Sequence, residues 1–228
     1  MHIPDGFLSY DVCGAAYAAS AIALGAAVKS AEKDDKGSYA PALGVTAAFV
    51  FSAQMINFPV GGGTSGHFLG ALFSAITLGP LNSILVMAVV LLIQCLMFAD
   101  GGVTALGANL FNMGLVGGVL SYVLFAGLKA IAPDNKKWFV LSAAAAAWFS
   151  VAASSACCAL ELAWSGVSPL NIVLPAMLSI HSVIGIGEAI VTASALSVVM
   201  ASRPDIIFAL TPSLVKIGGE AKPERPAG

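Results

Sequence analysis

The chain has 228 residues, of which 58% are hydrophobic and only 10% are charged, and its mean hydropathy is +0.92. These values lie far outside the range of soluble domains and indicate an integral membrane protein. A net charge of −2 and the lack of a basic cluster argue against nucleic-acid binding. No Lys or Arg precedes the first apolar stretch, so no signal peptide is predicted and Met1 is expected to be the mature terminus.

The N-terminal sequence Met1-His2-Ile3-Pro4-Asp5-Gly6 places an imidazole one residue after an α-amine. The amine and the His2 amide nitrogen would close a five-membered ring on a metal, and the His2 amide and imidazole would close a six-membered ring. Three nitrogens then lie in one plane, and another residue must fill the fourth corner. Square-planar nitrogen coordination indicates Ni(II) or Cu(II) rather than zinc or magnesium. The alternative is an ordinary frayed terminus.

Runs of about 20 apolar residues are long enough to cross a bilayer as helices. The sequence predicts an all-α, polytopic membrane helix bundle with seven spans, at 11–28, 40–58, 66–78, 81–98, 104–130, 138–163 and 170–201. The third span is short and lies between Gly61-Gly62-Gly63 and Gly79-Pro80. Six spans with a re-entrant piece are therefore the alternative.

The Lys and Arg residues predict the orientation of the bundle. All ten of them lie at the end of the first, fifth or seventh span or follow it, and with seven spans these three places share one side. The positive-inside rule makes that side cytoplasmic, so the N-terminus faces out and the C-terminus faces the cytoplasm. We therefore expect a single transmembrane domain, 1–228, with an extracellular metal-binding segment at 1–10 and a cytoplasmic tail at 203–228.

Two further histidines are candidates for the open corner. His67 lies at the predicted outer mouth of the third span, on the same side as His2, and is the expected fourth ligand. An interfacial histidine bonded to a loop carbonyl is the alternative. His181 lies about eleven residues into the last span, roughly 16 Å deep and far from that edge. We expect it to form a buried polar pair or network with Glu188, two turns further on.

Other polar groups in or beside the spans are expected to orient the ligands or to join helices rather than to bind the metal. With the pair above, the residues of this expected polar network are Ser65, Asn57, Gln94, Asn109, His181 and Glu188.

Four stretches carry a family resemblance: Met1-His2-Ile3-Pro4-Asp5-Gly6-Phe7, Gly63-Thr64-Ser65-Gly66-His67, Gly107-Ala108-Asn109-Leu110-Phe111-Asn112-Met113-Gly114, and His181 with Gly185 and Glu188. Together they resemble the CbiM/NikM family, the substrate-capture membrane components of energy-coupling-factor transporters for nickel and cobalt. The resemblance implies a seven-helix bundle in which the Met1 amine, the His2 amide and imidazole, and the His67 imidazole bind one divalent metal.

The resemblance also implies partners in the cell membrane of a prokaryote: a transmembrane coupling (T) component, a pair of cytoplasmic ATPases and a small accessory membrane subunit. Some relatives carry that subunit as a fused segment, but this chain is too short for one, so a separate subunit is expected. No Gly-x-x-x-x-Gly-Lys-[Ser/Thr] phosphate loop occurs, so no ATP hydrolysis and no other enzyme activity is expected here. Nickel and cobalt both remain open as the transported metal.

The rival interpretation is an intramembrane protease. Gly63-Thr64-Ser65-Gly66 matches the Gly-x-Ser-Gly nucleophile motif of rhomboid proteases, for which His181 could act as the base. Against it, Ser65 is predicted near the outer surface and His181 near the midplane, and the Met1-His2 terminus would have no role. Ser65→Ala separates the two, because it should abolish proteolysis and leave most metal binding. A secondary transporter or channel is the third alternative; loss of uptake without a neighbouring ATPase would argue against it.

Overall fold

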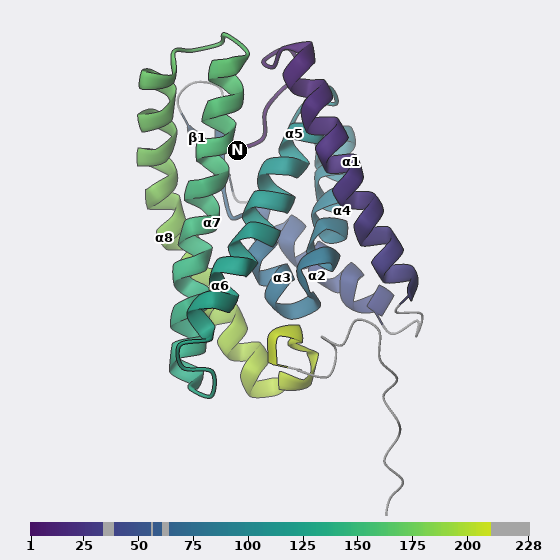
Figure 1. The fold of residues 1–228 in the computed structure, drawn as a ribbon, viewed down its shortest axis with the longest axis vertical. Helices are drawn as coiled ribbons and strands as arrows, with labels where there is room; N and C mark the ends of the chain where they lie inside the picture. The colour runs from purple at the N-terminus through teal and green to yellow at the C-terminus, as the bar shows by residue number, and fades with distance from the viewer. Residues whose placement is uncertain (34–38, 56, 61–63, 211–228) are drawn as a thin grey trace, which may run out of the picture.

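The computed structural model describes residues 1–33, 39–55, 57–60 and 64–210, and within these it is a helical bundle with one small β-hairpin (Figure 1). Its α-helices are α1 (Tyr10–Lys33), α2 (Tyr39–Gln54), α3 (Ala71–Leu78), α4 (Pro80–Phe98), α5 (Leu106–Leu110), α6 (Ser121–Lys129), α7 (Lys136–Trp164) and α8 (Leu170–Ser202). The π-helical stretch η1 (Phe111–Leu120) joins α5 to α6, and two short 3-10 turns, η2 (Pro204–Ile206) and η3 (Phe208–Leu210), follow α8.

The coarse prediction of a polytopic membrane helix bundle is confirmed. Within the described residues, five helical stretches are long and apolar enough to cross a membrane: Tyr10–Glu32, Pro80–Phe98, Leu106–Lys129, Lys136–Trp164 and Leu170–Ser202. Helix α2 contributes a shorter apolar stretch, Ala40–Gln54. The count of seven crossings and the orientation stay predictions.

The predicted second and third spans are wrong in their bounds. Helix α2 ends at Gln54, and the next described residues form an antiparallel hairpin of β1 (Asn57–Val60) and β2 (Thr64–His67). Only the eight residues of α3 are helical in the third span. Pro59 cannot donate a backbone hydrogen bond, and strand pairing satisfies the polar backbone that a helix would have satisfied. Gly61, Gly62 and Gly63 lie outside the described residues.

Gly70 marks where α3 can begin. Its φ is +72°, and a Cβ at this position would lie 2.7 Å from the Phe68 ring and 2.9 Å from Val50. A residue with a side chain would therefore be strained and would clash with α2. The chain turns sharply here between β2 and α3.

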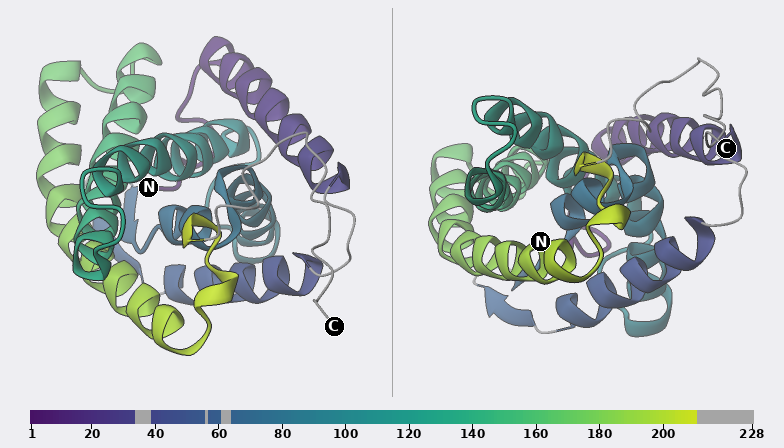
Figure 2. Two further views of the ribbon diagram at one scale, coloured as in Figure 1. Left: turned by 60° about the horizontal axis from the view of Figure 1, so that its bottom comes forward. Right: turned by 90° about the horizontal axis from the view of Figure 1, so that it is seen from below.

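Helices α1 and α8 lie on opposite sides of the bundle (Figure 1 and Figure 2). Helix α8 packs mainly along α7, and α4 contacts α1, α2, α3 and η1. Only 22% of the apolar window of either α1 or α8 is buried. The outward faces carry large apolar side chains such as Val183, Ile186 and Ile190, as expected for helices in contact with lipid.

The N-terminal segment before α1 runs into the bundle (Figure 1). Met1, His2 and Ile3 are 2%, 3% and 1% exposed. The first three residues are therefore part of the interior of the bundle rather than an exposed terminus. Ile3 favours the interior because burying its side chain is worth roughly 2 kcal/mol.

Candidate metal centre

The buried terminus is held through its backbone. The Ile3 N–H donates to Asn109 Oδ1 at 2.8 Å, and the Ile3 carbonyl accepts from Asn109 Nδ2 at 3.2 Å and from the Gly102 N–H at 2.8 Å. Asp5 Oδ1 accepts from the N–H and the hydroxyl of Thr104 at 2.7 and 2.6 Å. A Cβ on Gly102 would lie 2.3 Å from the Asp5 nitrogen, so only glycine permits this approach. These contacts fix the segment against the loop between α4 and α5.

The structure brings the three predicted ligand residues together. The Met1 amine lies 3.3 Å from His67 Nε2. The His2 and His67 rings lie side by side, with centroids 4.6 Å apart and planes inclined by 32°. Two nitrogens bound at about 2 Å in adjacent corners of a square would be about 3 Å apart. The separation of the amine and His67 is therefore close to what one shared metal requires.

Hydrogen bonds select the ring nitrogen that each histidine offers. His2 Nε2 lies 3.0 Å from Gln94 Oε1, which can only accept, so Nε2 carries the hydrogen. Nδ1 is left with its lone pair, and it is the nitrogen that closes the six-membered chelate. His67 Nδ1 donates to the Phe68 carbonyl at 2.7 Å, which leaves Nε2 facing the amine. Both rings are thus held in the tautomer that metal binding needs.

Burial keeps these nitrogens uncharged at neutral pH. Desolvation lowers the pKa of the Met1 amine from 8.0 to about 6 and that of His2 from 6.5 to about 3. The pKa of His67 falls well below its ordinary value, first through burial and then through the positive charge of the amine. Because only unprotonated nitrogens bind metal, the site is ready for a cation near pH 7.

Asp100 supplies the nearby acidic group. Its Oδ1 lies 3.4 Å from His2 Nδ1, and within the described part of the chain that nitrogen makes no hydrogen bond. Burial raises the pKa of this half-buried carboxyl. Asp100 and Gln54, whose side chain bonds Gln94, were not among the residues predicted from the sequence. Each is a lone polar residue in or beside an apolar run, and only its position there could have marked it.

The expected pair of His181 and Glu188 does not form. Glu188 accepts from the backbone of Leu69 and Gly70, and His181 Nδ1 donates to the Met177 carbonyl at 2.8 Å. Seven residues along a helix span about 10.5 Å, which no direct hydrogen bond can bridge.

His181 was expected to lie about 16 Å below the outer edge of the membrane and therefore far from the ligands placed there. Its imidazole is nevertheless near enough to His67 and the Met1 amine to interact with them electrostatically. The reason is that the terminus descends into the bundle. Asn57 pairs with His67 in the hairpin, but the side chains of Asn57 and Ser65 lie outside what the structure describes.

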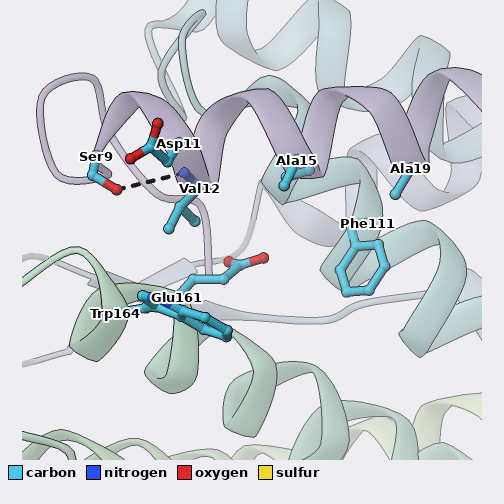
Figure 3. A pocket seen from close by; sticks show the side chains of 9 residues that line it. Ser9, Asp11, Val12, Ala15, Ala19, Phe111, Glu161 and Trp164 are labelled. Atoms are coloured by element: carbon cyan, nitrogen blue, oxygen red, sulfur yellow. Dashed lines mark hydrogen bonds between the residues drawn. The ribbon is translucent and has the colours of Figure 1, made fainter.

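A search of the described residues finds no cluster of three His, Cys, Asp or Glu side chains suited to a metal. The candidate centre does not depend on such a cluster, because its donors include a terminal amine and a backbone nitrogen. A cavity of about 620 Å³ opens between α1 and α7, where Asp11 and Glu161 line its wall (Figure 3). Met1, His2 and His67 do not line this cavity, so it is distinct from the candidate centre.

Fold and candidate site together define a multi-pass membrane protein with an internal group of nitrogen donors. A family model described as "Cobalt uptake substrate-specific transmembrane region" matches residues 2–206, and the chain belongs to this family, CbiM. It is therefore a substrate-specific membrane component of metal uptake in a prokaryotic cell membrane, and the predicted family is confirmed.

Named relatives agree with this assignment. A putative metal transport protein of Haloquadratum walsbyi is 40% identical over 210 residues, covering 91% of this chain and 94% of that protein. A putative fused nickel transport protein, NikMN, of Archaeoglobus fulgidus is 40% identical over 214 residues, covering 91% of this chain and 68% of that protein. The crystal structure of a truncated transition metal transporter matches with a TM-score of 0.82 at 33% identity, covering 88% of this chain and 99% of that one. These matches give the protease alternative no support.

Proposed function

We propose that this chain captures a divalent nickel or cobalt ion with high affinity at the outer face of the membrane, as the substrate-specific component of an ATP-driven energy-coupling-factor importer. The observation that carries the proposal is the approach of the Met1 amine to His67 Nε2, at 3.3 Å, with the His2 imidazole beside both. The amine, the amide and Nδ1 of His2, and Nε2 of His67 hold the transported ion.

The chemistry of these donors favours a planar ion. Four nitrogens, one of them a deprotonated amide, suit low-spin Ni(II) best and also accept Co(II). Relatives of this chain are named both as nickel transport and as cobalt transport proteins. The donor set alone does not separate the two metals. Copper would also bind such a set, so its exclusion depends on availability rather than on affinity.

The orientation proposed for the single domain, 1–228, places residues 1–10 on the extracellular side and the tail, 203–228, in the cytoplasm. In Figure 1 the C-terminal ends of α1 and α8 and the turn between α6 and α7 lie at the same end of the bundle. Most of the Lys and Arg residues belong to these three places, which supports the positive-inside assignment. The proposal counts α2 and α3 as crossings, which makes seven; Lys36 and 211–228 lie outside the described residues.

The energy for transport comes from partners in this proposal. They are a transmembrane coupling (T) component, two cytoplasmic ATPases and a small accessory membrane subunit, and the fused NikMN relatives support a partnership with further subunits. The chain itself has no phosphate-binding loop. ATP hydrolysis by the partners then drives the reorientation or gating that releases the ion inward.

Nickel titration of the purified chain tests the metal site. His2→Ala and His67→Ala should each weaken binding by at least about 100-fold, while Thr192→Val, on the buried face of α8, should bind like the parent. Parent-like affinity in both histidine variants would overturn the site. Deleting the neighbouring ATPases should abolish uptake by cells and leave binding intact; uptake that persists would contradict the importer.

A further inference from the structure

We infer that Glu188 is a positioning residue of the metal centre, and that it sets the geometry of both histidines by anchoring the backbone of Leu69. The inference rests on the proposed function, because it concerns the same nitrogen donors. Glu188 lies on α8 and is 1% exposed. A buried carboxylate is costly unless its oxygens are paired. The groups that pair with Glu188 therefore indicate the role of this side chain.

Both carboxylate oxygens of Glu188 are bonded to backbone amides. Oε2 accepts from the Leu69 N–H at 2.6 Å, and Oε1 accepts from the Gly70 N–H at 2.9 Å. These amides lie at the sharp turn between β2 and α3, where Gly70 has positive φ and no side chain caps the helix. Without Glu188, the two N–H groups would lose these acceptors, and a buried N–H without an acceptor is destabilising.

The first connection runs from Leu69 to His67 along the chain. Only Phe68 separates them, and its carbonyl accepts the hydrogen of His67 Nδ1 at 2.7 Å. The orientation of the ring therefore depends on the backbone that Glu188 fixes. A shift of this turn would rotate His67 Nε2 away from the Met1 amine.

The second connection runs from Leu69 to His2 through two glutamines. Gln54 Nε2 donates to the Leu69 carbonyl at 2.6 Å, Gln94 Nε2 donates to Gln54 Oε1 at 2.9 Å, and Gln94 Oε1 accepts from His2 Nε2 at 3.0 Å. Both glutamine side chains are fully buried. Each amide accepts at one end and donates at the other, so turning either one over would break two bonds.

The backbone of Leu69 is therefore a common anchor for the two histidines. Helix α8 contributes to it through Glu188 although it packs mainly on α7, at the edge of the bundle. Any displacement of α8 would reach both ligands through this residue. Hydrogen bonds thus connect α8 to both histidines through the Leu69 backbone, a connection that a purely lipid-facing helix would lack.

Glu188→Gln tests the inference because it keeps the size of the side chain and removes one acceptor. The full chain with its native terminus is titrated with Ni(II) alone, and visible absorption and magnetic susceptibility report the coordination. Glu188→Gln should bind nickel about 10–100-fold more weakly and show a larger paramagnetic fraction. Thr192→Val, one turn further along the same buried face, should match the parent in both. Affinity within about twofold of the parent with an unchanged spectrum in Glu188→Gln would overturn the inference.

Gln54→Met keeps the test decisive if Glu188→Gln folds poorly. It removes the donor to the Leu69 carbonyl and the acceptor of Gln94 Nε2, and it leaves both bonds of the Glu188 carboxylate in place. It should move affinity and magnetism in the same direction by less. Where Glu188→Gln also folds, the double variant should lose less than the sum of the two, because both act through Leu69. Strict additivity, or a Gln54→Met protein identical to the parent, would contradict the inference. A parent that bound no nickel would instead overturn the proposed function.

Discussion

The N-terminal segment and α8 differ in how their buried backbone N–H and C=O groups are hydrogen-bonded. The 33 residues of α8 bond to one another along the helix. Residues 1–9 form no helix, so the Ile3 backbone takes its partners from Asn109 and Gly102. The turn after β2 does the same with Glu188 and Gln54. Asn109, Glu188 and Gln54 are thus buried polar side chains that pair with the backbone of the non-helical segments next to the metal donors.

Extending the chain by one residue ahead of Met1 should have the largest effect. It converts the amine into an amide and removes one corner of the chelate, and the added residue must also fit where Met1 is 2% exposed. We expect nickel affinity to fall roughly 1000-fold, or about 4 kcal/mol. Isothermal titration of the extended and native chains measures it. Equal affinities would show that the terminus is not a ligand.

The second prediction concerns pH. Burial lowers the pKa of the amine from 8.0 to about 6, so the folded site should release about one proton per nickel, from the amide, above pH 6 and about two below it. As the pH is lowered, affinity should therefore fall about tenfold per pH unit down to pH 6 and about 100-fold per pH unit below pH 6. In an exposed Met-His-Ile peptide the amine would begin to compete near pH 8. A protein curve that bends at pH 8 would contradict a buried amine.

Asn109→Leu should have an intermediate effect. It removes both Asn109 hydrogen bonds to Ile3 and leaves the buried Ile3 N–H without this acceptor, while the Ile3 carbonyl keeps the Gly102 N–H. Nickel affinity should therefore fall about 10- to 30-fold. The matched control is Asn82→Leu on α4. Asn82 donates to the Leu78 carbonyl, four residues earlier in the chain, and this bond does not involve the N-terminal segment. Equal losses in the two variants would indicate general destabilisation rather than loss of the docked terminus.

The smallest effect is expected on the outer face of α8. Ile190 lies two residues from Glu188 along α8, but its side chain is 62% exposed whereas that of Glu188 is buried. Ile190→Leu should change nickel affinity by less than about twofold, since one lipid-facing aliphatic group replaces another. A large loss would mean that the face of α8, not its single carboxylate, sets the site.

The sequence predicted the long helices well because each is a continuous apolar run. The predicted spans 81–98 and 138–163 differ from α4 and α7 by two residues or fewer at either end. The hairpin was missed because the polar backbone of β1 and β2 is satisfied by pairing across a loop, which hydropathy does not reveal. The predicted second span, 40–58, includes the first two residues of β1, and the predicted third span, 66–78, includes the last two residues of β2. Neither apolar run indicates strand pairing.

The candidate ligands could be predicted from chelate chemistry, whereas the polar residues that hold those ligands in place could not. His2 and His67 could be named because few side chains complete a planar nitrogen set. Gln54 and Asp100 have no periodic pattern to mark them. The direct pair of His181 and Glu188, one of the two arrangements expected, does not form because about 10.5 Å of helix separates these residues.

The visible spectrum and magnetism of nickel bound to the chain with its native terminus test the central claim most directly. A terminal amine, an amide and two imidazoles in one plane predict a yellow, diamagnetic complex with one nickel per chain. A six-coordinate, paramagnetic complex in the native protein would contradict the claim that the buried terminus and His67 form the metal centre.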